Sequence, residues 1–254
     1  MIEVQRLYKH FGSVTAVEDV SFTVRQGETF ALLGPNGSGK TTTLKCLVGL
    51  IAPTSGEIRI AGVSRDRSRR LMSYLPQRVA FPEQVSALEV LEFYCKLRKL
   101  PLERIGPALE RASFNGAATR LVSEFSGGMM QRLGLAVATL SDAPILVLDE
   151  PTVGLDPEGA IAFRQWLLSF KSAGKTIVFS SHLLEDVELL ADRVAILVGG
   201  RLMAVEPVAA LRPQAPAARL WVEDIYLRYV HANSDRTAPA AGTGGLPDRT
   251  APAG

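Results

Sequence analysis

A glycine-rich segment between an apolar run and a helical pattern constrains this chain more than any other feature. Residues 34–41 read Gly-Pro-Asn-Gly-Ser-Gly-Lys-Thr and match the pattern GxxxxGK[ST]. An apolar run at 29–33 precedes the segment, and residues 41–50 have the spacing of a helix. Such a loop turns backbone N–H groups toward phosphate oxygens, and the helix presents its positive N-terminus to the same anion. A phosphate-binding strand–loop–helix unit is therefore predicted.

The residue types in this loop indicate which atoms meet a nucleotide. Lys40 is expected to reach the β- and γ-phosphates, and the Thr41 hydroxyl to ligate Mg²⁺. A glycine-rich turn without a ligand is the alternative, which the flanking strand and helix disfavour. The residues expected to contact the nucleotide are Gly34, Pro35, Asn36, Gly37, Ser38, Gly39, Lys40, Thr41 and Thr42.

A second motif lies further along, where an apolar run at 145–148 ends in Asp149 and Glu150. A buried strand of this kind delivers carboxylates to the carboxyl edge of a sheet, where ligands of open α/β folds bind. Asp149 is expected to hold Mg²⁺, and Glu150 to act as general base on the attacking water. A solvated acidic pair at a strand end is common, but after a phosphate-binding loop the pattern indicates nucleotide hydrolysis.

Short apolar runs alternate with helical segments through much of the chain. This alternation predicts a mostly parallel sheet covered on both faces. Two runs, 194–198 and 201–205, flank Gly199-Gly200 and indicate a hairpin. Near the start, alternating apolar and polar residues predict antiparallel strands with one wet face, at 3–8, 20–24 and 57–60.

Two further segments stand out from this pattern. Between Ser86 and Leu140 only helical patterns occur, so a helical insertion over about 84–141 is predicted. Residues 233–254 are rich in Ala, Pro, Gly and Thr, and repeat Asp-Arg-Thr-Ala-Pro-Ala. Such a segment cannot bury a core. We expect residues 1–232 to form one domain, followed by a disordered tail.

The composition supports one large α/β domain. Of the 254 residues, 47% are hydrophobic, which suits a sizeable core. The net charge of +2 gives no electrostatic footprint for nucleic acid, which needs a concentrated basic face. The N-terminus has no signal-peptide pattern, and no window approaches the ~18 apolar residues of a membrane span. Any role at a membrane is therefore expected to go through a partner.

Two smaller features leave alternatives open. Cys46 and Cys95 lie in apolar stretches outside any CxxC pair, so buried free thiols in a reducing compartment are expected rather than a disulfide or metal site. A basic cluster fits a solvated loop better than an acidic partner; it comprises Arg65, Arg67, Arg69 and Arg70.

In order along residues 1 to about 210, the motifs resemble the nucleotide-binding subunit of an ABC transporter. Ser126-Gly127-Gly128, followed by Met129 in place of Gln, resembles the family's signature. Val153-Gly154 replaces the usual Ser-Ala before Leu155-Asp156 of the D-loop. These departures concern the polarity of a dimer interface. The other matches are Gln77 (Q-loop), His182 (switch histidine) and Phe11 (the aromatic that stacks on adenine).

The resemblance implies a fold and a chemistry. The fold would be an α/β P-loop NTPase (RecA-like) core with a mostly parallel sheet, an N-terminal antiparallel β subdomain and an inserted α-helical subdomain. ATP and Mg²⁺ would be the cofactors. Gln77 and His182 would join Lys40 and Glu150 in catalysis, with Gln77 also at the metal. Further nucleotide contacts would come from Phe11, Ser126, Gly127, Gly128 and Asp156.

The resemblance also implies partners. Two subunits, identical or not, would bind head to tail, each ATP lying between one P-loop and the other subunit's signature. A separate membrane permease would be driven by this dimer, placing the chain at the cytoplasmic face of the inner or plasma membrane, away from nucleic acid. The segment 79–81 (Val-Ala-Phe) would either meet the permease or pack inside.

The end of the chain narrows the transporter class. Residues 221–229 resemble the terminal segment of ATPases serving ABC-2-type export permeases. A weaker resemblance is to ATPases of the copper-maturation transporter for nitrous oxide reductase. The alternative is a soluble ABC ATPase acting on ribosomes or DNA, which is disfavoured by a single P-loop, a single signature and no sustained heptads. The transported substrate leaves no trace in this chain.

Overall fold

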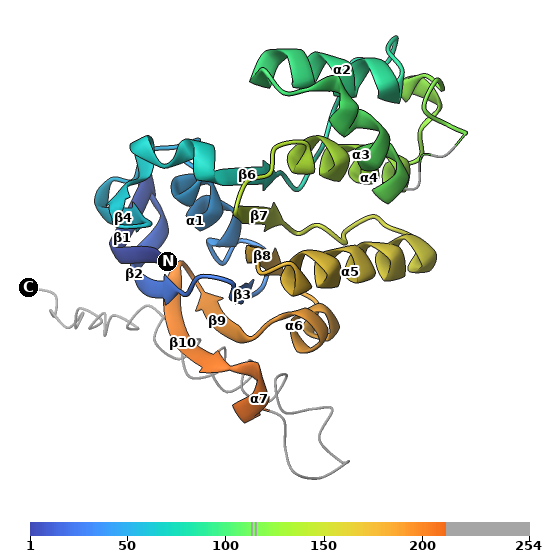
Figure 1. Ribbon diagram of the computed structural model, residues 1–254. Helices are drawn as coiled ribbons and strands as arrows, with labels where there is room; N and C mark the ends of the chain where they lie inside the picture. Colours follow the sequence, from blue (N-terminus) through green and yellow to red (C-terminus); the bar gives the residue numbers. More distant parts are fainter. Residues whose placement is uncertain (113, 115, 212–254) are drawn as a thin grey trace, which may run out of the picture.

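A six-stranded sheet forms the centre of the computed structural model, which describes residues 1–112, 114 and 116–211 (Figure 1). The strand order is β10-β9-β3-β8-β7-β6, and every neighbouring pair except β10–β9 is parallel. The carboxyl ends of the parallel strands therefore lie along one edge. The bounds are Thr29–Leu33 (β3), Met72–Leu75 (β6), Ile145–Asp149 (β7), Thr176–Ser181 (β8), Arg193–Val198 (β9) and Arg201–Pro207 (β10).

The inner strands explain why continuous apolar runs occur in the sequence. Every residue of β3, β7 and β8 is buried, because both faces of the sheet are covered. The strands β9 and β10 form the predicted hairpin, and Gly199 and Gly200 between them take φ angles of 56° and 82°. The edge strand β6 escapes the sequence pattern because Met72-Ser-Tyr-Leu is short and carries two polar side chains.

A second sheet is antiparallel throughout, as the alternating segments near the start predict. Its order is β2-β1-β4-β5. It is joined to the first sheet at Glu18, whose backbone N–H donates to the Gly200 carbonyl at 2.8 Å and whose carboxylate pairs with Arg201 at 2.6 Å. The bounds are Ile2–Phe11 (β1), Val14–Val24 (β2), Ser55–Ile60 (β4) and Val63–Ser64 (β5).

The two faces of the six-stranded sheet are covered by different elements (Figure 1). One face packs on the antiparallel sheet and on α1 (Lys40–Leu47), through side chains such as Phe30 and Leu44. The other face is covered by α5 (Pro157–Ser172), α6 (Leu184–Leu190) and part of α4 (Gly127–Thr139). The predicted fold class is confirmed.

A third core lies beside the sheet, among helices. It joins α2 (Ala87–Arg98), α3 (Ile105–Arg111) and α4 around Leu91 and Leu133. The start of α2 is fixed by a capping box between Ser86 and Glu89. The remaining helical elements of the described residues are short: Arg65–Arg67 (η1), Arg69–Leu71 (η2), Leu102–Arg104 (η3), Val122–Glu124 (η4) and Val208–Leu211 (α7).

The helical core is joined to the sheet by a close contact between Val79 and Gly134 of α4. A Cβ added at Gly134 would lie 2.7 Å from Cγ2 of Val79, so no larger residue fits there without displacement. Val79 and Phe81 are half-buried and pack against two of the buried clusters, whereas Ala80 is exposed. Contact of segment 79–81 with a permease stays a prediction.

Other expectations have mixed outcomes. Cys46 and Cys95 are free and buried, as predicted. The basic cluster is not uniformly solvated, because Arg65 donates to the carbonyls of Cys46 and Ile51 near the end of α1. Within the described ranges, no helix has the length and apolar character needed to cross a bilayer. The tail 233–254 and the segment 221–229 lie outside the described residues.

Candidate functional site

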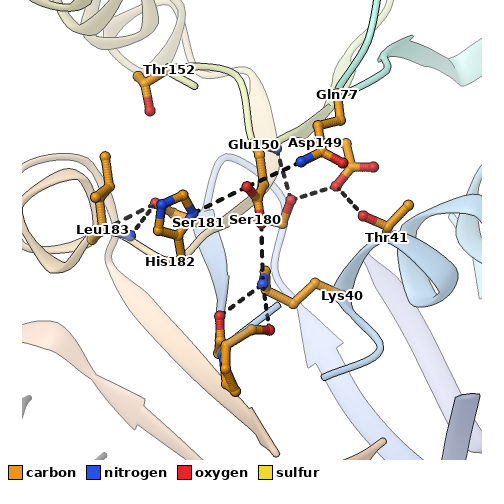
Figure 2. A network of polar contacts seen from close by, with 12 residues as sticks. Lys40, Thr41, Gln77, Asp149, Glu150, Thr152, Ser180, Ser181, His182 and Leu183 are labelled. Carbon is orange, nitrogen blue, oxygen red and sulfur yellow. Dashed lines mark hydrogen bonds and ion pairs between the residues drawn. The ribbon is translucent and has the colours of Figure 1, made fainter. Parts of the chain in front are cut away.

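Four loops at the carboxyl edge of the sheet gather the side chains that the motifs single out (Figure 2). The strands β3, β8, β7 and β6 are successive neighbours, so the segments that follow them lie together. Those segments carry Lys40, His182, Glu150 and Gln77, respectively. The sheet order thus brings together residues that are far apart in the sequence.

The glycine-rich loop borders a cavity of about 460 Å³. Gly39 requires its glycine, because φ is 96° and an added Cβ would lie 2.6 Å from the Ala16 carbonyl oxygen. Gly37 also takes a positive φ, of 80°. The lining comprises Phe11, Val14, Thr15, Ala16, Asn36, Gly37, Ser38, Gly39, Lys40, Thr41, Thr42, Gln77 and Glu150.

The Lys40 ammonium is held in the middle of this site. Its Nζ donates to the carbonyl oxygens of Gly34 at 2.7 Å and Pro35 at 3.0 Å. It also lies 3.2 Å from Oε1 of Glu150, with only 4% of the Lys40 side chain exposed. A charge so well buried needs these partners, since an unpaired ammonium is costly away from water.

Asp149 ends β7 and binds three hydroxyl groups. Its Oδ1 accepts hydrogen bonds from Thr41 Oγ1 at 2.9 Å and Ser180 Oγ at 2.7 Å. Its Oδ2 faces the Tyr74 hydroxyl at 3.4 Å. Burial raises the pKa of the Tyr74 phenol, and the neighbouring Asp149 carboxylate raises it further, so the phenol stays a donor. Sequence reasoning missed Ser180 and Tyr74; their only signal is that each lies in a strand ending at this edge.

The Glu150 side chain contacts one residue from each of the other three loops. Besides Lys40, its carboxylate contacts His182 Nδ1 at 3.1 Å and Gln77 Nε2 at 3.3 Å, both through Oε2. Its backbone N–H donates to Ser180 Oγ at 2.9 Å, and its φ of 45° is unusual for a residue with a side chain. Because a carboxylate only accepts, the His182 Nδ1 carries the hydrogen in this contact.

The residues present fit a triphosphate with a divalent cation. Ser38 Oγ is buried at the cavity without a hydrogen-bond partner, so it has a donor to offer. The Thr41 hydroxyl and the Asp149 carboxylate adjoin one another, and such oxygen donors are those that Mg²⁺ prefers. Lys40, at the start of α1, adds positive charge to the positive end of that helix.

Phe11 lies at the mouth of the cavity and outside the buried clusters. Half of its surface is exposed, at 50%. The Lys9 ammonium lies 4.8 Å from its ring centroid and also donates to the Ala52 carbonyl, so one ring face has a fixed neighbour. Sequence reasoning missed Val14, Thr15 and Ala16 as lining residues, because no motif marks them.

The signature residues lie apart from this cavity and do not line it. Ser126 caps α4, its Oγ accepting from the Met129 N–H at 3.3 Å, and Asp156 caps α5, accepting from Gly159 at 3.0 Å. The two caps are neighbours, since a Cβ at Gly128 would lie 3.9 Å from Asp156 Oδ1. Both capping residues are exposed.

Comparison with known proteins agrees with this geometry. Residues 17–153 match the family model described as ABC transporter. The chain is 42% identical over 206 residues to the ABC transporter ATP-binding protein YxlF of Bacillus subtilis (strain 168), which covers 80% of this chain and 69% of the relative. It is 37% identical over 206 residues to the lantibiotic transport ATP-binding protein SrtF of Streptococcus pyogenes, covering 80% and 89%.

A solved structure has the same architecture. The dimeric ATP-binding cassette MJ0796, in a post-hydrolysis state bound to ADP and Pi, superposes with a TM-score of 0.76 at 25% identity. The match covers 82% of this chain and 99% of the other. Family model, relatives and architecture agree with the cavity, its lysine and its carboxylates: the chain belongs to the ABC transporter family, as an ATP-binding subunit.

Proposed function

We propose that this ATPase subunit binds ATP with Mg²⁺ in the cavity of the glycine-rich loop and hydrolyses it with Glu150 as the general base. The observation that carries this role is the position of the Glu150 carboxylate, which is 5% exposed yet lines the cavity beside Lys40. A water held there can give its proton to a carboxylate that bulk solvent does not screen.

The other residues bind and orient the substrate. Amides of residues 36–41 and the Lys40 ammonium hold the phosphates, and Phe11 stacks on adenine. Thr41 and Asp149 would hold Mg²⁺, with Gln77 beside them. When bound, Mg²⁺ neutralises charge on the β- and γ-phosphate oxygens. His182, which contacts the same Glu150 oxygen as Gln77, restricts where that carboxylate points.

The Lys40–Glu150 ion pair suggests how substrate binding activates the general base. A γ-phosphate beside Lys40 competes with Glu150 for one ammonium group. Transfer of Lys40 to the phosphate releases Oε1 of Glu150, while Oε2 stays held by His182 and Gln77. The carboxylate therefore becomes available as a base only once substrate is present, which limits unproductive chemistry.

The subunit works as a dimer in this proposal, identical or mixed, with Ser126, Gly127 and Gly128 of the partner subunit completing each site. In one chain these residues lie outside the cavity, and they begin a helix whose N–H groups suit an anion. Asp156 opens the neighbouring helix α5 on the same exposed surface.

A membrane permease is the second proposed partner, which would place the subunit at the cytoplasmic face of the membrane. A cleft of about 720 Å³ lies between η2, β6 and the end of α2, and Arg69, Arg70, Arg98 and Lys99 line it with Leu97. Leu97 and Phe93, one helical turn apart, are 63% and 59% exposed. Such a surface fits a permease segment that carries acidic and apolar side chains.

The direction of transport is proposed from the relatives. The Nod factor export ATP-binding protein I of Paraburkholderia xenovorans (strain LB400), which is 37% identical over 218 residues, favours export. A soluble ATPase acting on ribosomes or DNA is not favoured. The resemblance to copper-maturation ATPases stays a prediction. So do the boundaries 84–141 of the helical subdomain.

Phosphate release by the full chain with ATP and Mg²⁺ tests the general base. Glu150→Gln should lose turnover, whereas Glu206→Gln, an exposed glutamate in β10 away from the cavity and the proposed dimer surface, should keep the parental rate. Parental turnover in Glu150→Gln would overturn the assignment.

Charge reversal in the cleft lining tests whether the permease binds there. Arg70→Glu with Lys99→Glu should abolish co-purification with the permease and leave basal hydrolysis unchanged. Lys96→Glu, on the same helix but outside the cleft lining, is the control. Retained association in the double variant would place the permease elsewhere.

A further inference from the structure

A buried hydrogen bond outside the cavity joins the turn after Glu150 to the helix after His182. Thr152 Oγ1 donates to Asp186 Oδ2 at 2.6 Å, and these residues are only 8% and 2% exposed. Thr152 lies two positions after Glu150, and Asp186 four positions after His182 within α6. The bond therefore connects the two segments whose side chains meet at 3.1 Å in the site.

The same carboxylate holds a third segment. Its Oδ1 accepts from Nε of Arg164 in α5 at 2.7 Å, and Arg164 also pairs with Glu185 at 3.2 Å. The helix α5 begins at the exposed cap Asp156. Asp186 thus connects the turn that carries Glu150, the helix that follows His182 and the helix at the proposed dimer surface.

Several contacts hold the turn that follows Glu150. At its start, the Glu150 backbone N–H donates to Ser180 Oγ at 2.9 Å, which fixes it to the end of β8. Further along, the Thr152–Asp186 bond fixes the turn to α6. On the side of α4, the turn is held by Gln131 Nε2, which donates to the Pro151 carbonyl at 3.3 Å. On the other side, the bonds of Ser181 with Leu183 are local, so they fix the segment around His182 to α6 but not to the turn. Figure 2 shows Thr152 on the side of the site where His182 and Leu183 lie.

We propose that Thr152 and Asp186 are positioning residues for hydrolysis: their bond sets the separation of Glu150 and His182. Neither residue lines the cavity, so their effect acts through Glu150. The inference rests on the proposed role of Glu150 as general base. A misplacement of about 1 Å can lower a rate about 100-fold without weakening substrate binding.

Thr152→Val is the main test, because it removes the hydroxyl and preserves both shape and the Asp186–Arg164 pair. For phosphate release by the full chain with ATP and Mg²⁺, we expect kcat to fall about ten-fold and KM to change less than about two-fold. Thr152→Ser should restore kcat. Should Thr152→Val fail to fold, Thr152→Ala carries the same test.

A matched control separates positioning from stability. Thr139 is also 8% exposed, and its hydroxyl donates to the carbonyls of Leu135 and Ala136 far along α4. Thr139→Val loses a buried hydroxyl of the same kind, and should leave kcat unchanged.

The imidazole signals of His182 give a readout that does not depend on turnover. The chain has three histidines, so the His182 ring resonances can be assigned by their loss in His182→Gln. Thr152→Val should shift them, and Thr139→Val and Thr152→Ser should not. An unshifted His182 signal, or an unchanged kcat, in Thr152→Val overturns the positioning role. Failure of the proposed general base is distinct, because it would appear as parental turnover in Glu150→Gln whatever the His182 signal does.

Discussion

The Lys40 ammonium and the Glu150 carboxylate form an ion pair 3.2 Å long between side chains that are 4% and 5% exposed. Neither charge is well solvated, so each depends on the other. The pair joins the glycine-rich loop, which we propose binds phosphate, to the turn that carries the proposed general base. Substitutions on its two sides should therefore separate binding from chemistry.

Lys40→Ala should weaken ATP binding, because it removes the cation that we propose binds the phosphates. The substitution also removes the ammonium group that pairs with the buried Glu150 carboxylate. Because this leaves a buried charge without its ion-pair partner, the free energy of unfolding should fall by about 3 kcal/mol. Glu150→Gln should bind ATP at least as tightly as the parent, because Lys40 loses a competing carboxylate, and should trap a closed dimer without turnover. Nucleotide titration and size-exclusion chromatography with ATP measure these effects. Equal ATP affinity in Lys40→Ala and the parent would contradict the phosphate role.

Phe11→Ala should raise the dissociation constants of ATP and GTP several-fold and by similar factors. A ring face does not read hydrogen bonds, and a base–aromatic stack contributes on the order of 1 kcal/mol. Phe11→Tyr, which keeps the ring, is the control and should bind like the parent. Competition with a fluorescent nucleotide provides the constants. An unchanged affinity in Phe11→Ala would remove this residue from the adenine site.

Mixed dimers should reveal a site shared between subunits. With Lys40→Ala on one subunit and Ser126→Arg on the other, sharing puts both lesions into one site and leaves one site intact. With both lesions on a single subunit, sharing breaks both sites, whereas sites private to each chain leave one intact.

Single-round cleavage of the γ-phosphate in tandem-linked dimers is the suitable measurement, because steady-state turnover depends on both sites. Activity that survives only when the lesions share a chain would exclude the composite site. Activity that survives only when they are on different chains is the expected outcome.

Burial raises the pKa of the Cys46 thiol to about 11. A thiol whose pKa is higher in the folded state stabilises that state fully below its unfolded pKa, which is 9.0, and this contribution is lost as the pH rises toward 11. The free energy of unfolding of the parent should therefore fall relative to Cys46→Ala by roughly 1–2 kcal/mol between pH 8.5 and 10.5. Urea titrations of both proteins measure the difference. A constant difference across this range would show that the thiol is not shielded.

The fold was predictable wherever local pattern and burial agree. The runs that become β3 and β7 are apolar at all but one position each, and β8 contains the apolar run 177–179, because both faces of the sheet are covered. The strand β6 is not predictable in this way. It is short and lies at an edge, and Ser73 in it bonds to Ser141, an interaction across 68 positions that no local pattern reveals.

The sequence predicts which residue types belong to the candidate site, but it does not predict which residues are in contact. Lys40, Asp149 and Glu150 sit in contiguous motifs, and chemistry dictates those residues. The bridging hydroxyl of Ser180 and the Thr152–Asp186 bond depend on the order of strands in the sheet, which places positions 30 or more residues apart in contact. That order is a tertiary property, so a motif read along the chain does not contain it.

The contact between Val79 and Gly134 has a mechanical consequence. Val79 lies two positions after Gln77, and Gly134 belongs to the helix that Ser126 opens. The Val79 side chain lies so close to the Gly134 backbone that it leaves no room for a Cβ there. We expect this contact to resist sliding of the loop along the helix, so that the two move together. A displacement of the loop should therefore move the helix, and with it the surface that carries Ser126, because a change of side-chain rotamer cannot accommodate the displacement. Within one subunit the spacing of Gln77 and Ser126 is expected to stay constant while the gap between two subunits opens and closes.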